Sequence, residues 1–268
     1  MIKVIISHDV DHLTVWEHKR DLIIPKFIIR SSIELLIGSI SLKEYLYRFK
    51  DFIKNKWNNI NELMEFNKQY NIPATFFFAV NNGLGLSYNL DDANRYINLL
   101  KEYNFEIGIH GIEFDDLDKM KKEFELFKKL SGEKEFGIRM HYLRHNKNTL
   151  NLLSHIGYSF DSSVLEDKNP YKIGNMWEFP LHIMDGYIIQ GKGKRWQSKT
   201  LEEIKNDTKK RLEDLHKKGV KYVSILFHDR YFSDSFITWK NWYIWLIEYL
   251  KENKVEFISY KNAIKRLE

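Results

Sequence analysis

The sequence predicts an α/β fold, in which a parallel sheet is connected by helical crossovers, and three observations lead to this prediction. Short apolar runs rich in β-branched or aromatic residues recur along the chain, as is typical of buried strands. Segments with the spacing of amphipathic helices lie between these runs. Ligand-type side chains follow several of the runs, and in a closed βα barrel the carboxyl ends of the strands meet at one mouth.

The composition is ordinary for a globular protein. The chain has 268 residues, of which 43% are hydrophobic and 29% charged, enough for one large domain or two small ones. Cysteine is absent, which excludes disulfides and thiolate metal sites. The formal net charge is +5 without an arginine-rich run, so an anionic glycan or lipid head group fits as well, and we expect no nucleic-acid partner. No signal peptide is visible, and we expect a cytoplasmic location.

The first predicted strand, residues 2–6, ends in a group of ionisable side chains, His8 to His12. Asp9 and Asp11 point the same way if the strand continues that far. Two carboxylates so close raise each other's pKa unless a cation or a catalytic proton balances their charge. The pair therefore indicates either a metal site with an adjacent general base or a polar loop at a strand end.

Residues 13–55 are predicted to form a helical insertion after the first strand. The most apolar part, residues 22–42, is interrupted by Lys26, Arg30 and Glu34, which share one helix face at spacings of four. Three charges argue against a transmembrane span. We expect the insertion to pack on the body of the fold; the alternative is an amphipathic surface for a partner or for peripheral membrane contact.

The other elements alternate along the chain. The predicted helices cover residues 57–70, 91–103, 115–130, 149–155, 200–218 and 239–252. The predicted strands cover residues 74–80, 105–109, 137–141, 158–161, 222–227 and 255–258, with further strands around 178 and 187–189. Proline and glycine separate several of them, for example at Pro73, Gly157 and Gly219.

Candidate functional residues gather at five predicted strand ends. They are Asp9 and Asp11, His110, Arg139 and His141, Asp161, and His228. A single histidine in such a place is usually a hydrogen-bonded structural residue, but the recurrence favours a metal-dependent hydrolase. Other histidines have weaker assignments: His8 and His12 as partners of the aspartates, His182 in a substrate groove, and His18, His155 and His216 on solvated helices.

Several motifs carry a resemblance to a known family. They are Asp9-Val10-Asp11, Asn71 to Phe77, Glu106 to Gly111, Gly137 to Tyr142, Gly157-Tyr158 with Asp161-Ser162-Ser163, and Ile225 to His228. In this order they resemble the polysaccharide deacetylases, the NodB-homology family of carbohydrate esterases (family 4). The resemblance spans nearly the whole chain outside the 13–55 insertion. It implies one domain over residues 1–268, a distorted (β/α)7 barrel, and a divalent metal, usually zinc.

The second motif departs from the family pattern. The family normally has a second histidine four residues after the first, and this sequence has Phe114 there, which cannot bind a metal. Zinc needs about three protein ligands and an open position. Asp11 and His110 supply two, and we expect His141 as the third because it lies two residues from Arg139 on the same strand face. The alternative ligands are Glu113 and Asp115.

The resemblance also implies an activity, the removal of N-acetyl groups from a glycan or glycolipid precursor. Asp9 is then the general base, Arg139 holds it ionised and oriented, and His228 protonates the leaving amine. The expected substrate contacts are Tyr142, whose backbone N–H completes an oxyanion hole, Asp161, which is otherwise a support behind the site, and His182.

Two other functions remain open. One is a catalytically silent glycan-binding or assembly protein on the same barrel, which the phenylalanine in the second motif suggests. The other is a metal-dependent hydrolase that acts on a different amide or a phosphoester.

Overall fold

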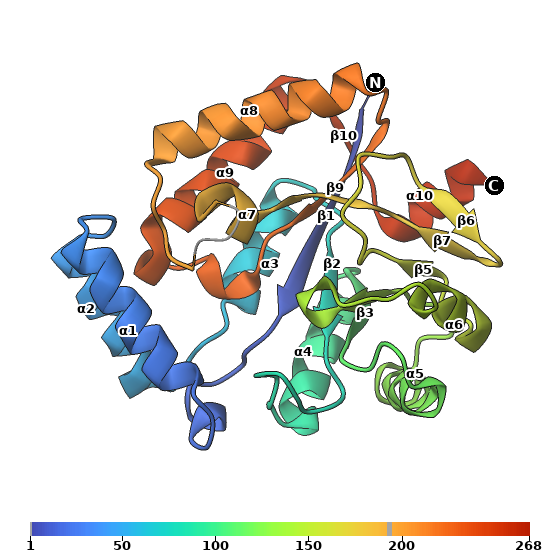
Figure 1. Cartoon of the computed structure of the whole chain (residues 1–268), viewed down its shortest axis with the longest axis horizontal. Coiled ribbons are helices and arrows are strands. Elements are labelled where there is room, and N and C mark those ends of the chain that lie inside the picture. Colours follow the sequence, from blue (N-terminus) through green and yellow to red (C-terminus); the bar gives the residue numbers. More distant parts are fainter. Residues whose placement is uncertain (1, 192–194) are drawn as a thin grey trace.

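The computed structural model describes residues 2–191 and 195–268 (Figure 1). Its strands form one curled, mostly parallel sheet in the order β6-β7-β5-β4-β3-β2-β1-β9-β8, with β10 paired to β1. The strands are β1 (Lys3–Val10), β2 (Thr75–Phe78), β3 (Glu106–Gly111), β4 (Ile138–Met140), β5 (Phe160–Asp161), β6 (Tyr171–Ile173), β7 (Met176–Glu178), β8 (Leu181–Met184), β9 (Tyr222–Leu226) and β10 (Glu256–Phe257). Among the described strands, only β6 and β7 pair antiparallel.

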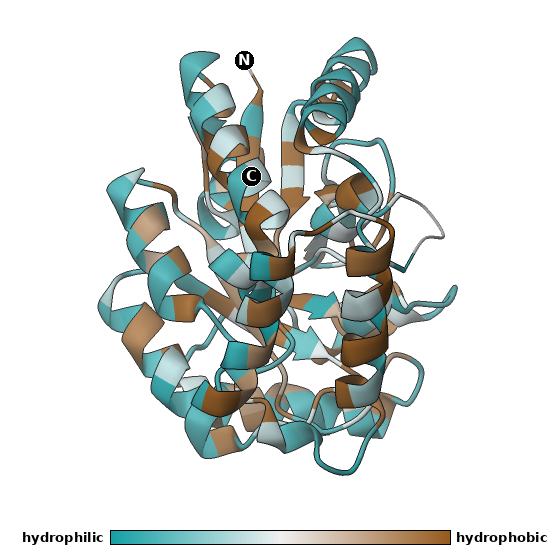
Figure 2. Ribbon diagram, turned by 90° about the vertical axis from the view of Figure 1, so that its left-hand side faces the viewer, coloured by the Kyte–Doolittle hydropathy of each residue, from teal (hydrophilic) through white to brown (hydrophobic). Residues whose placement is uncertain are grey.

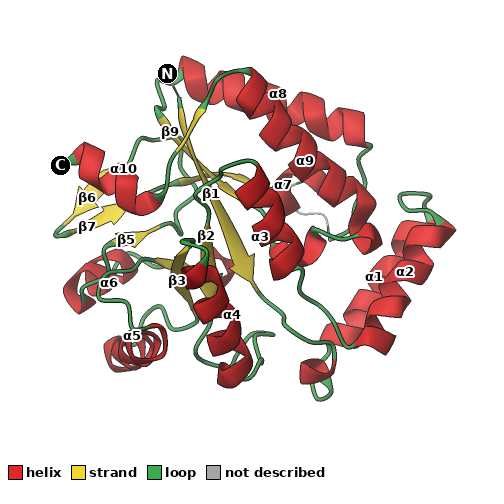
Figure 3. Ribbon diagram, turned by 180° about the vertical axis from the view of Figure 1, so that it is seen from behind, coloured by secondary structure: helices red, strands yellow, loops and turns green. Residues whose placement is uncertain are grey.

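Helices surround this sheet, and Figure 3 shows them from behind. They are α1 (Ile23–Leu36), α2 (Leu42–Lys54), α3 (Ile60–Gln69), α4 (Leu90–Glu102), α5 (Leu117–Ser131), α6 (Thr149–Ile156), α7 (Asp185–Ile189), α8 (Leu201–Lys217), α9 (Ile237–Glu252) and α10 (Tyr260–Leu267). The short turns of 3-10 helix are η1 (Trp16–His18), η2 (His141–Leu143), η3 (Asp229–Tyr231) and η4 (Asp234–Phe236). No described helix is both long and apolar enough to cross a membrane.

The predicted fold class is confirmed. Helices follow strands along most of the chain, and the sheet curls into a barrel that stays open between its edge strands, β6 and β8. One prediction was wrong: residues 187–189 belong to α7 and not to a strand. A short apolar run cannot distinguish the two structures, and here Ile189 is buried in the core from a helix.

The strand register brings the candidate residues to one edge of the sheet. In β1 every residue from Val4 to Val10 is buried. Parallel pairing sets Asp9 beside Phe77 of β2 and His110 of β3 beside Arg139 of β4. Because these strands run in the same direction, their carboxyl ends open into the same space.

Helices α1 and α2 lie where the helical insertion was predicted, side by side at the edge of the barrel (Figures 1 and 3). A buried ionic cluster fastens them to the body: Arg48 of α2 pairs with Glu34 of α1 and donates to the Ser235 carbonyl at 2.9 Å. Their outer side carries exposed aliphatic residues, and Figure 2 looks onto this side.

Candidate metal centre and active site

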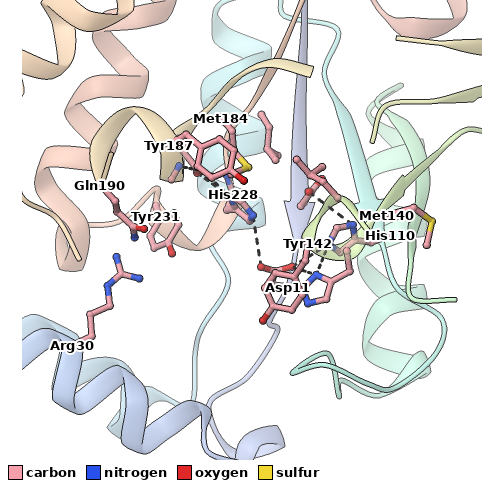
Figure 4. Close-up of a pocket in the computed structure, with 16 residues that line it drawn as sticks. Asp11, Arg30, His110, Met140, Tyr142, Met184, Tyr187, Gln190, His228 and Tyr231 are labelled. Carbon is pink, nitrogen blue, oxygen red and sulfur yellow. Dashed lines mark hydrogen bonds and ion pairs between the residues drawn. The ribbon is translucent and has the colours of Figure 1, made fainter. Parts of the chain in front are cut away.

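A cavity of about 310 Å³ opens at the carboxyl ends of the strands (Figure 4). This volume is at the lower end of the range for small-molecule sites. The ionisable side chains that line it are Asp9, Asp11, Arg30, His110, His141, Tyr142, Asp185, Tyr187, His228 and Tyr231.

Strand β1 supplies the two carboxylates from alternate positions. Asp9 is the last but one residue of the strand and is buried, while Asp11 follows the strand and keeps partial access to the cavity. His8 points to the opposite face, where its ring nitrogens contact the Phe227 carbonyl at 2.8 Å and the Asn67 amide at 2.9 Å. His8 is therefore a core histidine and not a partner of the aspartates, and burial lowers its pKa to about 3.

Three of the predicted residues converge on one point: Asp11, His110 and His141. The distances are 2.9 Å between His110 Nε2 and His141 Nδ1, 3.2 Å from His110 Nε2 to Asp11 Oδ1, and 3.5 Å from His141 Nδ1 to Asp11 Oδ1. Ligands in a tetrahedral zinc site lie about 3.4 Å apart, given metal–ligand distances of ~2.1 Å. Asp11 Oδ1 is buried and has no hydrogen-bond partner among the described residues.

The other ring nitrogens fix how these two histidines are protonated. His110 Nδ1 faces the Arg139 carbonyl at 3.0 Å, and His141 Nε2 faces the Leu84 carbonyl at 3.2 Å. A carbonyl only accepts, so each of these nitrogens carries the proton, and the nitrogens that face each other present lone pairs. Two lone pairs and a carboxylate oxygen at this distance require a positive charge between them, either an extra proton or a metal cation. Two imidazoles and one carboxylate are a donor set that suits zinc.

The electrostatics favour this arrangement. Burial alone would raise the pKa of Asp11, but His110, His141 and His228 hold it well below its ordinary value. Burial lowers the pKa of His141 to about 4, so this ring is neutral and ready to act as a ligand at neutral pH. Burial also opposes protonation of His110, but Asp9 and Asp11 outweigh it and raise the pKa of that ring.

Asp9 lies between the candidate ligands and Arg139. Arg139 Nη1 donates to Asp9 Oδ1 at 2.9 Å, while Asp9 Oδ2 is 3.9 Å from His110 Nδ1. Ser162 and Tyr260 accept three further hydrogen bonds from the guanidinium, and the group lies 4.6 Å from the Phe77 ring. Arg139 is completely buried, so it orients Asp9 from behind without reaching the cavity.

His228 approaches Asp11 from the other side of the cavity, with Nε2 3.7 Å from Asp11 Oδ2 (Figure 4). Its Nδ1 contacts Asp185 Oδ1 at 2.9 Å. Burial would lower the pKa of His228, but the Asp185 carboxylate raises it well above its ordinary value, so the ring is an imidazolium at neutral pH. Asp185 is a site residue that the sequence analysis missed.

The fold that carries this site is similar to that of several solved structures. The sequence matches no protein-family model and no curated protein. A structure described as a polysaccharide deacetylase from Mycobacterium smegmatis superposes with a TM-score of 0.65 at 16% identity, over 99% of this chain and 89% of that one. The chain has the fold of the polysaccharide deacetylases. The PuuE allantoinase is similar to the same degree, with a TM-score of 0.64 at 16% identity over 97% of this chain and 87% of that one.

Phe114, the residue at which the second motif departs from the family pattern, lies outside the cavity. Phe114 is half-buried and lies 4.3 Å from the Arg144 guanidinium. The alternative ligands do not join the cluster either: Glu113 lies 3.9 Å from Lys119, and Asp115 is exposed. The histidine that completes the cluster comes instead from the end of the neighbouring strand, β4.

The turn after β4 places Tyr142 at the cavity mouth. Tyr142 and Leu143 both have positive φ angles, 57° and 53°, which are uncommon for residues other than glycine. Strained backbone of this kind clusters at functional sites. The Tyr142 side chain is 67% exposed and lines the cavity, where its hydroxyl donates to the Leu84 carbonyl at 3.3 Å.

Two predicted substrate contacts need correction, because both side chains are buried and lie outside the cavity. Asp161 accepts from the Ser163 hydroxyl at 2.6 Å and from its backbone N–H at 3.1 Å, so it supports the loop behind Arg139. His182 contacts the Lys168 carbonyl at 3.0 Å and the Ser224 N–H at 3.1 Å through its two ring nitrogens. Neither side chain has access to a substrate in this structure.

A second histidine cluster lies beside the insertion. His18 was expected on a solvated helix, but it is buried, with Nδ1 2.8 Å from Asp21, Nε2 2.8 Å from His12 Nδ1 and 3.1 Å from Glu17. His12 accordingly belongs to this cluster. The described residues make no hydrogen bond to its second ring nitrogen, so the proton can lie on its Nδ1 and fill the contact with His18. This network therefore lacks the paired lone pairs of the first cluster.

Proposed function

We propose that this protein is a metal-dependent hydrolase that removes the N-acetyl group from a sugar of a glycan or glycolipid precursor. One observation carries the proposal: the three converging donors lie between a carboxylate fixed by a buried arginine and a histidine kept protonated by a buried aspartate. An amide hydrolase needs these parts: a cation site, a base and an acid. The deacetylase fold supports the proposal.

Asp11, His110 and His141 would hold the cation, which would act as a Lewis acid towards the amide carbonyl and would lower the pKa of water. Asp9 accepts the proton of the attacking water, and Arg139 keeps the carboxylate in place. His228 donates its proton to the departing amine nitrogen. The backbone at Tyr142 is the candidate donor to the oxyanion.

The test measures acetate release from acetylated sugars by the purified protein after addition of zinc and after treatment with a chelator. We expect activity that depends on the metal, and a loss of roughly 10²- to 10⁴-fold in Asp9→Asn, the usual contribution of a general base. His155→Ala changes an exposed helical histidine outside the cavity and serves as the control. Near-normal turnover by Asp9→Asn with metal still bound would contradict the assignment of the base.

A silent glycan-binding protein remains the alternative, and elemental analysis separates the two. Stoichiometric zinc retained by the wild type and lost from variants of the three donors supports the enzyme. A protein that binds acetylated sugars but takes up no divalent metal supports the alternative.

We also propose that the outer face of α1 and α2 contacts an anionic membrane surface. It carries exposed aliphatic side chains: Leu22, Ile29, Leu36, Ile37, Leu42, Leu46 and Ile53. All exposed charged residues between positions 19 and 54 are basic: Lys19, Arg20, Lys26, Lys43, Lys50 and Lys54. Apolar side chains surrounded by lysine and arginine are typical of helices that lie in the membrane interface.

Co-sedimentation with phosphatidylcholine vesicles, with and without phosphatidylglycerol, tests this contact. We expect binding that requires the anionic lipid and is lost in Leu36→Asp with Ile53→Asp. Leu165→Asp changes an exposed leucine elsewhere and should bind normally. If the double variant sediments like the wild type, or if the wild type forms a salt-resistant dimer through this face instead, the membrane proposal is wrong.

A further inference from the structure

Helix α1 of the insertion sends one cationic side chain into the active-site cavity. Arg30 lines the cavity together with the catalytic groups, and it is the one lysine or arginine among the described residues that do so. In Figure 4 its guanidinium points toward Gln190 and Tyr231, across the cavity from Asp11. A residue from the inserted helices thus contributes to the site that the barrel strands form.

Arg30 is held in this orientation by Glu34, one helical turn further along. Its Nε donates to Glu34 Oε1 at 3.0 Å, and the Arg30 side chain retains 23% exposure. Glu34 is completely buried and accepts from the Gln197 backbone N–H at 2.8 Å as well. The guanidinium therefore has a fixed position on the cavity wall and does not extend freely into water.

The ionic cluster behind this wall is short of negative charge. Glu34 is shared between two guanidiniums, those of Arg30 and Arg48. Glu44 lies 3.4 Å from Arg48, but burial raises its pKa to about 7, so it carries only part of its charge at neutral pH. The cluster keeps a net positive charge, and Arg30 is its member at the cavity.

The carboxylates of the cavity do not neutralise this charge, because each has a cationic or imidazole partner of its own. Asp9 is bonded to Arg139, Asp11 lies against the two candidate metal-binding histidines, and Asp185 is bonded to His228. The cavity therefore has two different sides, the metal and proton-transfer groups on one and the Arg30 guanidinium on the other.

The residues beside Arg30 are suited to a polar ligand. Gln190 carries an amide, and Tyr187 and Tyr231 carry hydroxyl groups, and all three side chains line the cavity, with the Tyr231 hydroxyl hydrogen-bonded to Arg30 (Figure 4). They come from the same short segments as the catalytic acid: Gln190 follows α7, which begins with Asp185, and Tyr231 ends η3, which follows His228. A ligand bound at this wall therefore has a fixed position relative to His228, the proton donor.

We propose that Arg30 binds an anionic substituent of the substrate, a phosphate ester or a carboxylate, while the acetamido group lies at the metal. The guanidinium presents a planar set of donors that matches the oxygens of either group, and a charge-assisted bond of this kind is stronger than a neutral one. The substrate class is then an acidic acetylated sugar and not a neutral polymer. This inference rests on the proposed deacetylase function.

Binding of the deacetylated products tests Arg30 without turnover, because glucosamine 1-phosphate and glucosamine differ in the anionic group alone. Calorimetric titration of the zinc-loaded protein should show tighter binding of the phosphorylated sugar. Arg30→Gln should weaken that binding by roughly 10- to 100-fold, as expected for a hydrogen bond to a charged group, and leave glucosamine within about twofold. Arg30→Lys keeps the charge and should retain part of the preference. Lys26→Gln, an exposed position on the same helix, should bind like the wild type.

A carboxylate ligand, glucosaminuronic acid, is titrated in parallel, and the tighter of the two acidic sugars identifies the substituent. Equal affinity of wild type for acidic and neutral sugars overturns the proposal, as does an equal loss of both in Arg30→Gln with an unchanged melting temperature. Should Arg30→Gln unfold, the comparison of Arg30→Lys with wild type decides.

Acetate release is measured separately from binding, so the two proposals fail in different ways. Binding that depends on Arg30 without acetate release from any acetylated sugar supports the anion site and contradicts the deacetylase. Acetate release that is equal for neutral and acidic sugars, in wild type and Arg30→Gln alike, supports the deacetylase and overturns the role of Arg30.

Discussion

Removal of the His141 imidazole is the most direct perturbation of the candidate metal centre. His141 supplies one of three donors, at 2.9 Å from His110 Nε2 and 3.5 Å from Asp11 Oδ1. With a pKa of about 4, the ring is already neutral at pH 7, and a cation that binds displaces no proton from it. The His141→Ala variant therefore loses the full contribution of this donor to metal affinity. Changes that act only through a ligand's partner cost 10- to 100-fold in metal affinity, so we expect at least about tenfold, or 1.4 kcal/mol.

The assay is competition for zinc with a chromogenic chelator, with circular dichroism to confirm the fold. His145→Ala removes an exposed histidine near the same turn and is the matched control. The double variant His141→Ala with Phe114→His places a histidine four residues after His110, and we expect no recovery because Phe114 lies outside the cavity, beside Arg144. Unchanged affinity in His141→Ala, or full recovery in the double variant, would refute this ligand assignment.

Three further predictions follow from buried charges. Asp185→Asn removes the anion that raises the pKa of His228; since the acid must be protonated, the alkaline limb of the kcat/KM profile should move to lower pH, and an NMR titration of His228 should show the same direction. Arg139→Gln leaves Asp9 buried without its cation and should lower the free energy of unfolding by about 3–5 kcal/mol in urea titrations, whereas Lys172→Gln, at an exposed position, should not. Burial raises the pKa of Glu123 from 4.5 to about 7, so between these pH values the folded state holds a proton that the unfolded state has released. The free energy of unfolding should therefore fall as the pH rises from about 4.5 to 7. In urea titrations, Glu123→Gln should show a flatter dependence of this free energy on pH.

The part of the site that lies on regular strands could be predicted from the sequence. Asp9, Asp11 and His110 follow runs of buried residues whose parallel direction places their ends together, and this requires no knowledge of the loops. His141 was within reach because β4 lies next to β3 and pairs His110 with Arg139. These predictions depended on the alternating direction of side chains along neighbouring strands.

The residues from irregular segments could not be assigned in this way. Strand β8 has a register shift between Leu181 and Ile183, so the alternation breaks at His182, and Asp185, three residues later, faces the site instead. The sequence around these residues has no period that would reveal a bulge. The insertion posed the same difficulty: η1 is a single turn, and His18 is buried there by contacts with distant parts of the chain, such as Trp57.

Phe114 in the second motif bears less on the candidate metal centre than the sequence suggests. A metal centre depends on the number and type of donors that converge, and not on which strand supplies them. Here the donor absent after β3 has a counterpart after β4, because the carboxyl ends of adjacent parallel strands lie together. The Arg139 carbonyl accepts from His110 Nδ1, and the Leu84 carbonyl accepts from His141 Nε2. The other nitrogen of each ring is therefore left with a lone pair. Backbone carbonyls can only accept, so the demand for a positive charge at this point comes from the carbonyls of Arg139 in β4 and of Leu84, and it does not depend on the residue at position 114.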